Sequence, residues 1–333
     1  LVLIEKYGAD AVRIGMLLCS SAGNDIFYDE SQIEQGRNFC NKIWNSFRLV
    51  QGWSVDESLQ QSDVNSLSVK WFENKMNQAI TIVEDHYAKF RISDALMAIY
   101  KLFWDDYCAW YLEAVKPAYG QAIDRATYDA TCIFFEKLLK MIHPVMPFIS
   151  EELWQSMAER PEGATIMFEK TPQAGPVDED FITAFGMAQE VINTVRGTRQ
   201  QKNISPKEEL QVLFKGDFPM NMTPVVRKLG NVSSIALTDD FGDTSEGVSA
   251  LVRTVEMFIP LAGMVNVEEE IRKIEGELEH QRSFLESVRK KLGNESFVAH
   301  APEKVVAMER KKEADSLAKI EAYEKALESL KNR

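Results

Sequence analysis

Apolar residues recur at helical spacing through the first half of the chain, and this pattern predicts a bundle of helices. Steps of three and four residues separate the apolar positions, with polar residues between them. We expect helices over about residues 29–50, 66–89, 93–116 and 121–142, then a short one near 147–154. Ser93 is the expected N-cap of the third helix. Short connections between these helices favour an up-and-down arrangement.

The middle of the chain changes from a helical to a mixed pattern. Residues 161–177 are rich in Pro and Gly and are predicted to be a linker. A helix is expected over about 179–200, followed by a strand through Leu210, Val212 and Phe214, where apolar and polar residues alternate. Two further alternating runs, near 248–252 and 255–259, are typical of hairpin strands. A small α/β module is therefore expected to end at about residue 262.

Beyond Gly263 the apolar positions follow the heptad spacing of a coiled coil. Steps of three and four join Leu278, Gln281, Leu285 and Val288, with Gln281 the polar position of the seam. A turn is expected between residues 293 and 302, after which Val306, Leu317, Ile320 and Leu327 face the first helix. Each helix has nearly thirty residues, so the hairpin would project roughly 40 Å as an exposed arm.

These patterns predict a mainly α fold: a helical bundle, a small α/β module and a C-terminal antiparallel coiled-coil hairpin. The expected boundaries are 1–30 for an N-terminal segment, 31–160 for the bundle, 161–177 for the linker, 178–262 for the module and 263–333 for the arm.

Charge limits the possible partners. The 333-residue chain has a net charge of -13, which disfavours indiscriminate binding to nucleic acid through excess Lys and Arg. Residues 261–333 carry 14 basic and 15 acidic residues, so this region is far less acidic than the rest. Any contact with nucleic acid is therefore expected to be local.

The remaining composition contains no signal for chemistry or for a membrane. The four cysteines are widely spaced without a CxxC pair, and no run approaches the roughly 20 apolar residues that cross a bilayer. No Gly-rich phosphate loop, nucleophile with a base, or metal-ligand spacing is apparent. We therefore expect a cytoplasmic protein with no metal site, no membrane partner and no catalysis of its own.

Several segments carry a resemblance to a known family. EKYGADAVR (5–13), DIFYDE (25–30) and RNFCNKIWN (37–45) resemble the part of class I aminoacyl-tRNA synthetases that follows the KMSKS loop. CAWYLEAVKP (108–117) and HPVMPFISEELW (143–154) resemble the anticodon-binding bundle of the valyl, isoleucyl, leucyl and methionyl enzymes. IPLAGMVNVEEEI (259–271) and KLGNESFVAHAPEKVV (291–306) are similar to the arm of bacterial valyl-tRNA synthetases.

The resemblance implies a C-terminal fragment of such a synthetase, beginning just after the signature loop. Residues 1–30 would contact the tRNA stem, the bundle would bind the anticodon, and the arm would bind the tRNA corner. The parent enzyme would join valine to its tRNA with ATP and Mg2+. The HIGH and KMSKS signatures and the editing domain would lie upstream, so we expect no cofactor here. The expected partner is valine tRNA, with no DNA, and the expected state is a monomer.

The resemblance and the polar helix faces together suggest anticodon-binding residues. They are Asn38, Asn41, Lys42, Asn45, Trp71, Asn74, Lys75, Phe90 and Arg91. Amides donate and accept hydrogen bonds, as reading of unstacked bases requires. Asn41 and Asn45 could instead bridge neighbouring helices while Trp44 fills the core, and Trp71 could close the end of the bundle rather than stack on a base.

Other polar residues are candidates for the rest of the tRNA. Lys6, Tyr7 and Arg13 match the family helix that touches the inner side of the tRNA, although Arg13 could simply pair with Asp10. Candidates for the tRNA backbone are Arg196, Arg199, Lys202, Arg282, Arg289, Lys290, Lys291, Lys304, Arg310, Lys311 and Lys312. Arg196, Arg199 and Lys202 could equally belong to a solvated helix face. Coiled-coil faces are normally charged, which favours that explanation for any single arm residue, whereas the clustering of these residues near one end of the arm favours a phosphate surface. The alternative function is a cytosolic coiled-coil scaffold that binds a protein partner and no RNA.

Overall fold

A computed structural model describes residues 1–19, 29–262, 267–294 and 303–331. The chain forms two compact units. The first contains residues 1–196, 209–241 and 250–258, and the second contains 197–208, 242–249 and 259–333.

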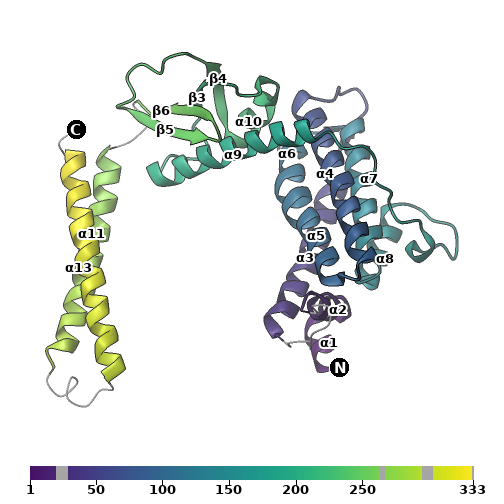
Figure 1. Ribbon diagram of the computed structural model, residues 1–333, viewed down its shortest axis with the longest axis horizontal. Coiled ribbons are helices and arrows are strands. Elements are labelled where there is room, and N and C mark those ends of the chain that lie inside the picture. Colours follow the sequence, from purple (N-terminus) through teal and green to yellow (C-terminus); the bar gives the residue numbers. More distant parts are fainter. Residues whose placement is uncertain (20–28, 263–266, 295–302, 332–333) are drawn as a thin grey trace. The chain divides into compact units, whose positions relative to one another are not determined.

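A helical bundle dominates the first unit (Figure 1). Its helices are α1 (Val2–Tyr7), α2 (Ala9–Leu18), α3 (Glu30–Gln51), α4 (Asp63–Ala88), α5 (Ile92–Lys101), α6 (Leu112–Val115), α7 (Arg125–Ile142) and α8 (Pro147–Met157). A π-helical stretch, η1 (Leu102–Tyr111), joins α5 to α6 without a break. The short strands β1 (Val55–Asp56) and β2 (Ile123–Asp124) pair in parallel and bring two interhelical loops together.

The predicted helices of the bundle are confirmed, with differences at their first residues. The Ser62 hydroxyl accepts a hydrogen bond from the Asn65 amide, so α4 begins three residues earlier than expected. The Asp124 carboxylate likewise caps α7, which begins later than expected. Ser93 as an N-cap is wrong, because Arg91 is at that position and the helix already begins at Ile92.

Aromatic side chains form the centre of the bundle core. The ring of Phe72 on α4 lies 5.1 to 5.2 Å, between centroids, from the rings of Tyr107, Tyr111 and Phe134. All four side chains are buried. The Tyr111 hydroxyl is 2.8 Å from the Thr131 hydroxyl, so its polar end is satisfied inside the core. Large rings from α4, η1 and α7 therefore fix the spacing of these three elements.

The α/β module contains α9 (Glu179–Lys202), β3 (Leu210–Lys215), α10 (Thr223–Gly230), β4 (Val232–Leu237), β5 (Gly247–Val252) and β6 (Val255–Pro260). Its sheet has the strand order β4-β3-β6-β5. Strand β3 pairs in parallel with β4 and antiparallel with β6. The strands expected near 210–214, 248–252 and 255–259 are confirmed, whereas the bounds of α10 and β4 were not predicted. The expected linker contains one 3-10 turn, η2 (Ile166–Phe168).

The arm consists of α11 (Val267–Leu292) packed along α13 (Glu303–Lys331) (Figure 1). Leu278, Leu285 and Val288 are buried in its seam as predicted. The prediction that Leu317 faces the first helix of the arm is wrong: its side chain is 42% exposed, and the neighbouring Ser316 is buried instead. Residues 295–302 of the expected turn lie outside the described residues. The predicted fold class, mainly α with these three parts, is confirmed, while the domain boundaries remain predictions.

Candidate nucleic-acid interface

Helix α3 presents a row of amides to solvent. Its apolar residues Ile33, Phe39 and Ile43 are buried, and the opposite side of the helix is therefore left polar. Asn38, Asn41 and Asn45 are exposed and are separated by steps of three and four residues, so they share one side of the helix. We call these three residues the α3 ridge. Their side chains are accessible to a partner.

Lys42 and Trp44, which neighbour the α3 ridge in the sequence, differ in exposure. The Lys42 ammonium lies 5.3 Å from the centre of the Trp104 ring, and the lysine is only half-buried. The expectation that Trp44 fills the core is wrong, because its side chain is 43% exposed. Arg48 is also exposed, three residues beyond Asn45, and continues the ridge although it was not predicted. Its helical spacing from Asn45 is the signal that could have identified it.

The predicted residues on α4 lie against other parts of the protein. The Trp71 side chain is 1% exposed and stacks on Phe185 of α9. The Asn74 side chain is buried, donates to the Lys70 carbonyl oxygen and accepts from the Asp178 amide at 2.6 Å. For Trp71 the structure therefore favours the alternative that this ring closes the end of the bundle.

Lys75 faces a carboxylate within the bundle. Its ammonium is 3.7 Å from the Asp106 carboxylate, and both side chains are about three-quarters buried. Burial raises the pKa of Asp106 to about 6, and the nearby Lys75 opposes the shift. The Lys75 charge therefore already has a partner.

Phe90 and Arg91 form the turn between α4 and α5. The Phe90 backbone has a positive φ of 57°, which is unusual for a bulky side chain. The Arg91 amide donates to the His86 carbonyl oxygen, and this bond closes the turn. Phe90 is 81% exposed and Arg91 is exposed, so both are accessible, as the predicted contact with a base requires.

The N-terminal candidates make contacts inside the protein. The Lys6 ammonium is 2.8 Å from the Glu30 carboxylate, which also accepts a hydrogen bond from the Tyr7 hydroxyl. These bonds lower the pKa of Glu30, with Lys6 the larger cause. Arg13 donates through Nε to the Val145 carbonyl oxygen and through a terminal nitrogen to that of Pro144.

Asp10 has a role other than the alternative pairing with Arg13. Its carboxylate accepts hydrogen bonds from the amides of Phe148 and Ile149, in the first turn of α8. A buried carboxylate at a helix N-terminus satisfies amides that have no partner within the helix. Burial raises the pKa of Asp10, and the two amide bonds oppose that shift. Asp10 and Arg13 thus join α2 to the corner between α7 and α8.

The three basic candidates on α9 differ in accessibility. Arg196 is exposed, but its guanidinium lies 5.7 Å from the Trp110 ring centre and donates to the Leu229 carbonyl oxygen. Arg199 is buried and donates to the Ser205 carbonyl oxygen, so a phosphate contact by this residue is not compatible with its position. Lys202 is half-exposed.

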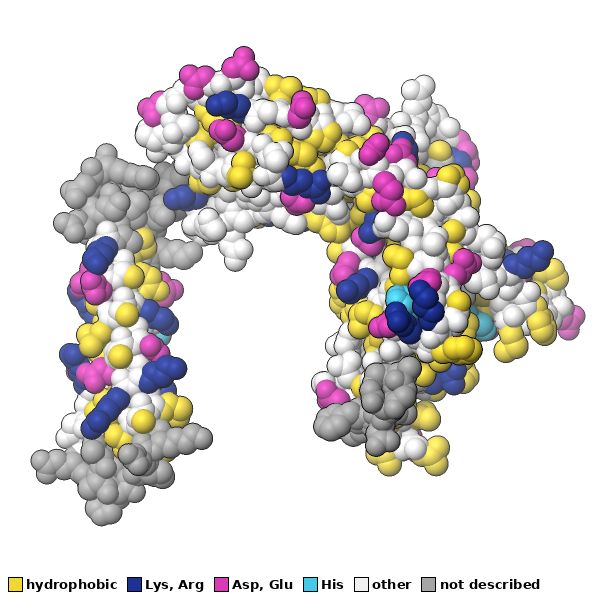
Figure 2. Space-filling model, in the orientation of Figure 1, with side chains coloured by type: hydrophobic (Ala, Val, Ile, Leu, Met, Phe, Trp, Pro, Cys, Tyr) yellow, Lys and Arg dark blue, Asp and Glu magenta, His cyan; other side chains and the backbone are white. Residues whose placement is uncertain are grey.

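The basic residues of the arm that were predicted to contact the tRNA backbone fall into two groups. Members of the first group face carboxylates on the hairpin: the pairs are Arg282–Glu324, Arg289–Glu313, Lys291–Glu309 and Lys312–Glu309. Lys290, Arg310 and Lys311 form the second group; they are exposed and make no ion pair with a described residue. We call these three the unpaired arm cations. The side chain of Lys304 lies outside the described residues. Basic side chains are spread along the visible face of the hairpin (Figure 2).

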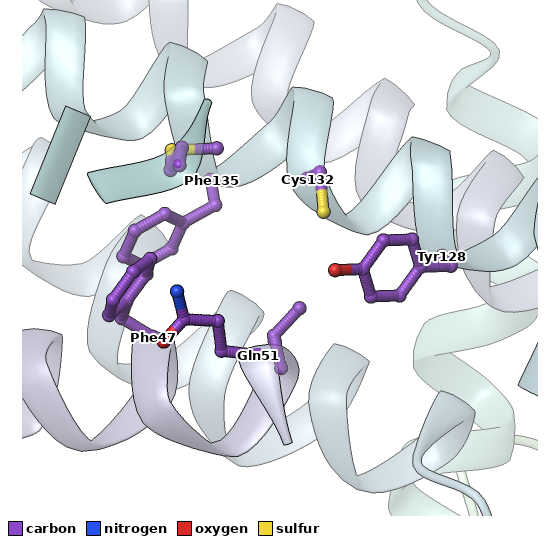
Figure 3. Close-up of a pocket in the computed structure, with 7 residues that line it drawn as sticks. Phe47, Gln51, Tyr128, Cys132 and Phe135 are labelled. Carbon is purple, nitrogen blue, oxygen red and sulfur yellow. The ribbon is translucent and has the colours of Figure 1, made fainter. Parts of the chain in front are cut away.

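A small pocket lies between α3, α7 and α8. Phe47, Phe135 and Gln51 line it, and the Tyr128 hydroxyl lies beside the Cys132 thiol (Figure 3). Burial raises the pKa of Cys132, which keeps the thiol protonated and unreactive at neutral pH. Within the described part of the chain, no three His, Cys, Asp or Glu side chains are placed to hold a metal ion. None of the described helices is long and apolar enough to cross a membrane.

Two protein families match the chain. One, described as the anticodon-binding domain of tRNA ligase, matches residues 69–214, and the other, the valyl tRNA synthetase tRNA binding arm, matches residues 266–331. The valine–tRNA ligase of Parabacteroides distasonis is 48% identical over 330 residues, covering 99% of this chain and 38% of that enzyme. The chain belongs to the bacterial valyl-tRNA synthetase family, as its C-terminal region.

Other valyl-tRNA synthetases align in the same way. The enzyme of Porphyromonas gingivalis is 46% identical, with coverage of 100% of this chain and 38% of the enzyme. That of Geobacillus stearothermophilus is 31% identical, with coverage of 99% and 39%. The chain thus spans about 38% of the length of the first of these relatives. The match to the tRNA binding arm, over residues 266–331, contains all three unpaired arm cations. The α3 ridge precedes residues 69–214, which match the anticodon-binding domain.

Proposed function

We propose that this chain is the tRNA-recognition part of an enzyme that joins valine to its tRNA using ATP and Mg2+. The match of residues 266–331 to the tRNA binding arm of valyl-tRNA synthetases carries this proposal. It is supported by relatives named valine–tRNA ligase that align with nearly all of the chain. The partner is valine tRNA, and the chain acts as a monomer in the cytoplasm.

The α3 ridge is our proposed surface for the anticodon. Asn38, Asn41 and Asn45 are exposed, and each amide offers both a donor and an acceptor to a base edge. Unstacked bases in an RNA loop expose such edges, which side chains can read. Phe90 and Arg91 are a second exposed group that could stack on a displaced base. Trp71 and Asn74 are not part of this surface because both are buried.

The arm is our proposed surface for the tRNA backbone. Lys290, Arg310 and Lys311 are exposed and have no ion pair with a described residue, so binding a phosphate would not require them to leave a carboxylate. Arg282 and Arg289 would each have to do so. The unpaired arm cations are therefore expected to supply most of the salt-dependent affinity.

A binding measurement with the isolated chain tests the proposal. We expect it to bind valine tRNA more tightly than a non-cognate tRNA, with an affinity that falls as salt increases. The 333 residues contain no HIGH or KMSKS sequence, so the chain should show no valine-dependent exchange of pyrophosphate into ATP. A chain that binds no tRNA at low salt but captures a protein through its hairpin would overturn the proposal in favour of the scaffold. Exchange at an enzymatic rate would contradict the assignment as a non-catalytic part.

A further inference from the structure

A groove lies between the beginning of α4 and the segment that leads into α10. Its α4 wall includes Ser62 and Ser66, and its other wall includes Thr223, Arg227 and Lys228. We call it the α4–α10 groove. Both walls belong to the first compact unit. Residues 62–67 and 220–228 lie outside both family matches, which cover 69–214 and 266–331.

The polar atoms of this groove favour an anion. Arg227 and Lys228 are exposed, and each contributes a positive charge to one wall. Helix α4 has 26 residues, and its first turn, with the partial positive charge of a helix N-terminus, forms the facing wall. The hydroxyls of Ser66 and Thr223 are further possible donors. Among the residues that line the groove, Asp63 is the one carboxylate, and it opposes this preference.

Lys228 lies beside a second lysine. Its ammonium donates to the Lys116 carbonyl oxygen at 3.2 Å. Surrounding protein atoms lower the pKa of Lys228, and the Lys116 charge adds to that effect. Glu113 is the nearby acid, but it already pairs with Lys116 at 2.6 Å. A bound phosphate would therefore relieve a local excess of positive charge in an otherwise acidic chain.

The groove also has an apolar part. Val64 and Leu67 line the α4 wall, and Met220 and Pro224 line the other. Such side chains can contact the face of a base, while nearby donors and cations contact the adjoining phosphate. In a duplex the base faces are stacked and inaccessible, so this combination suits an unpaired strand.

We propose that the α4–α10 groove binds a single-stranded segment of tRNA, with Arg227 and Lys228 on its phosphates and the apolar wall against one base. The proposal rests on the proposed function, because it assumes that the chain binds tRNA. It adds a third tRNA-binding surface, lined by residues of the bundle and of the α/β module, to the α3 ridge and the arm.

The first test removes the two cations together. We would measure binding of the whole chain to valine tRNA over a range of salt concentrations, for wild type, Arg227→Ala/Lys228→Ala and the control Lys207→Ala/Lys215→Ala. The control residues are exposed, belong to the same part of the sequence and do not line the groove. The groove variant should bind more weakly. Its slope of log affinity against log salt concentration should be shallower than that of wild type by about 1.4, at roughly 0.7 per single-stranded phosphate. The control should keep the wild-type slope.

A second variant avoids the structural contacts of the two cations, since Arg227 also donates to the Ser233 carbonyl oxygen. Ser66→Glu adds a carboxylate to the exposed α4 wall, in a first turn where acidic residues are favourable. Its melting temperature should not fall, and its affinity for valine tRNA should. The matched control Gln211→Glu places the same charge on an exposed position of β3 and should bind as wild type does.

The outcomes separate the two proposals. If wild type binds no tRNA, the proposed function fails and this inference fails with it. If wild type binds and both groove variants behave like their controls, the groove does not contact RNA while the proposed function stands. If the double alanine variant does not fold, the comparison of Ser66→Glu with Gln211→Glu decides.

Discussion

The indole of Trp71 stacks on the ring of Phe185, with centroids 4.4 Å apart and planes inclined by 10°. This contact joins α4 of the bundle to α9 of the module. Asp178, just before α9, strengthens the joint by pairing with Lys70 at 2.9 Å and by donating its amide to Asn74. The side of α4 that sequence alone suggested for base contacts is thus occupied by the protein itself.

Trp71→Ala should destabilise the fold. A fully buried large aromatic typically costs about 3–5 kcal/mol when truncated, through lost burial and the cavity that remains. Urea unfolding followed by circular dichroism would measure the loss, and Ile133→Ala, at an exposed apolar position of α7, is a control that should change little. The milder Trp71→Phe should keep the preference for valine tRNA. Loss of that preference in a stable Trp71→Phe protein would restore a role in base recognition.

Replacing two ridge amides, Asn38→Ala/Asn41→Ala, should weaken binding to valine tRNA more than binding to the same tRNA with an altered anticodon. Base contacts specify a sequence, whereas phosphate contacts do not. Filter binding with the two tRNAs measures the difference. The control Gln200→Ala/Gln201→Ala removes two exposed amides from α9 and should leave the discrimination unchanged. Equal losses on both tRNAs would show that the α3 ridge does not read the anticodon.

Neutralising the unpaired arm cations, Lys290→Ala/Arg310→Ala/Lys311→Ala, should lower the affinity for cognate and non-cognate tRNA alike. The slope of log affinity against log salt should become shallower by somewhat under one for each lost phosphate contact. The comparison variant Arg282→Ala/Arg289→Ala removes cations that face Glu324 and Glu313 and should change the slope less. The reverse order of effects would mean that the paired arginines leave their carboxylates to bind RNA.

Asp106→Asn should stabilise the protein at neutral pH. The folded-state pKa of Asp106 is raised from 3.8 to about 6, so folding favours the protonated carboxyl. The free energy of unfolding that this preference contributes is fully present below about pH 4 and is lost as pH rises through 6. Removing the charge should gain about 1–3 kcal/mol at pH 7, the lower figure if Lys75 suffers from losing its partner. Urea unfolding between pH 4 and 8 measures this, with the exposed Asp217→Asn as control. A variant that keeps the wild-type decline above pH 4 would assign that decline to another group.

The order and type of the helices could be predicted from the sequence because helical periodicity and capping are local. The apolar steps of α3 and α4 indicated the faces that pack, and the alternation at Leu210, Val212 and Phe214 indicated β3. The heptad spacing from Leu278 to Val288 predicted a helical hairpin, because only a partner helix can cover such a narrow seam. The fold class follows from these signals.

Which polar residues remain accessible was decided by the tertiary structure. Trp71 lies off the apolar stripe of its own helix, and the ring of Phe185, more than a hundred residues later, stacks on it and helps to bury it. Ser316 rather than Leu317 faces the seam of the arm because the packing of α13 against α11 sets that choice. The same packing brings Arg289 to Glu313 and leaves Lys290 exposed. Periodicity along one helix describes a single face, whereas accessibility depends on every distant segment that packs against it.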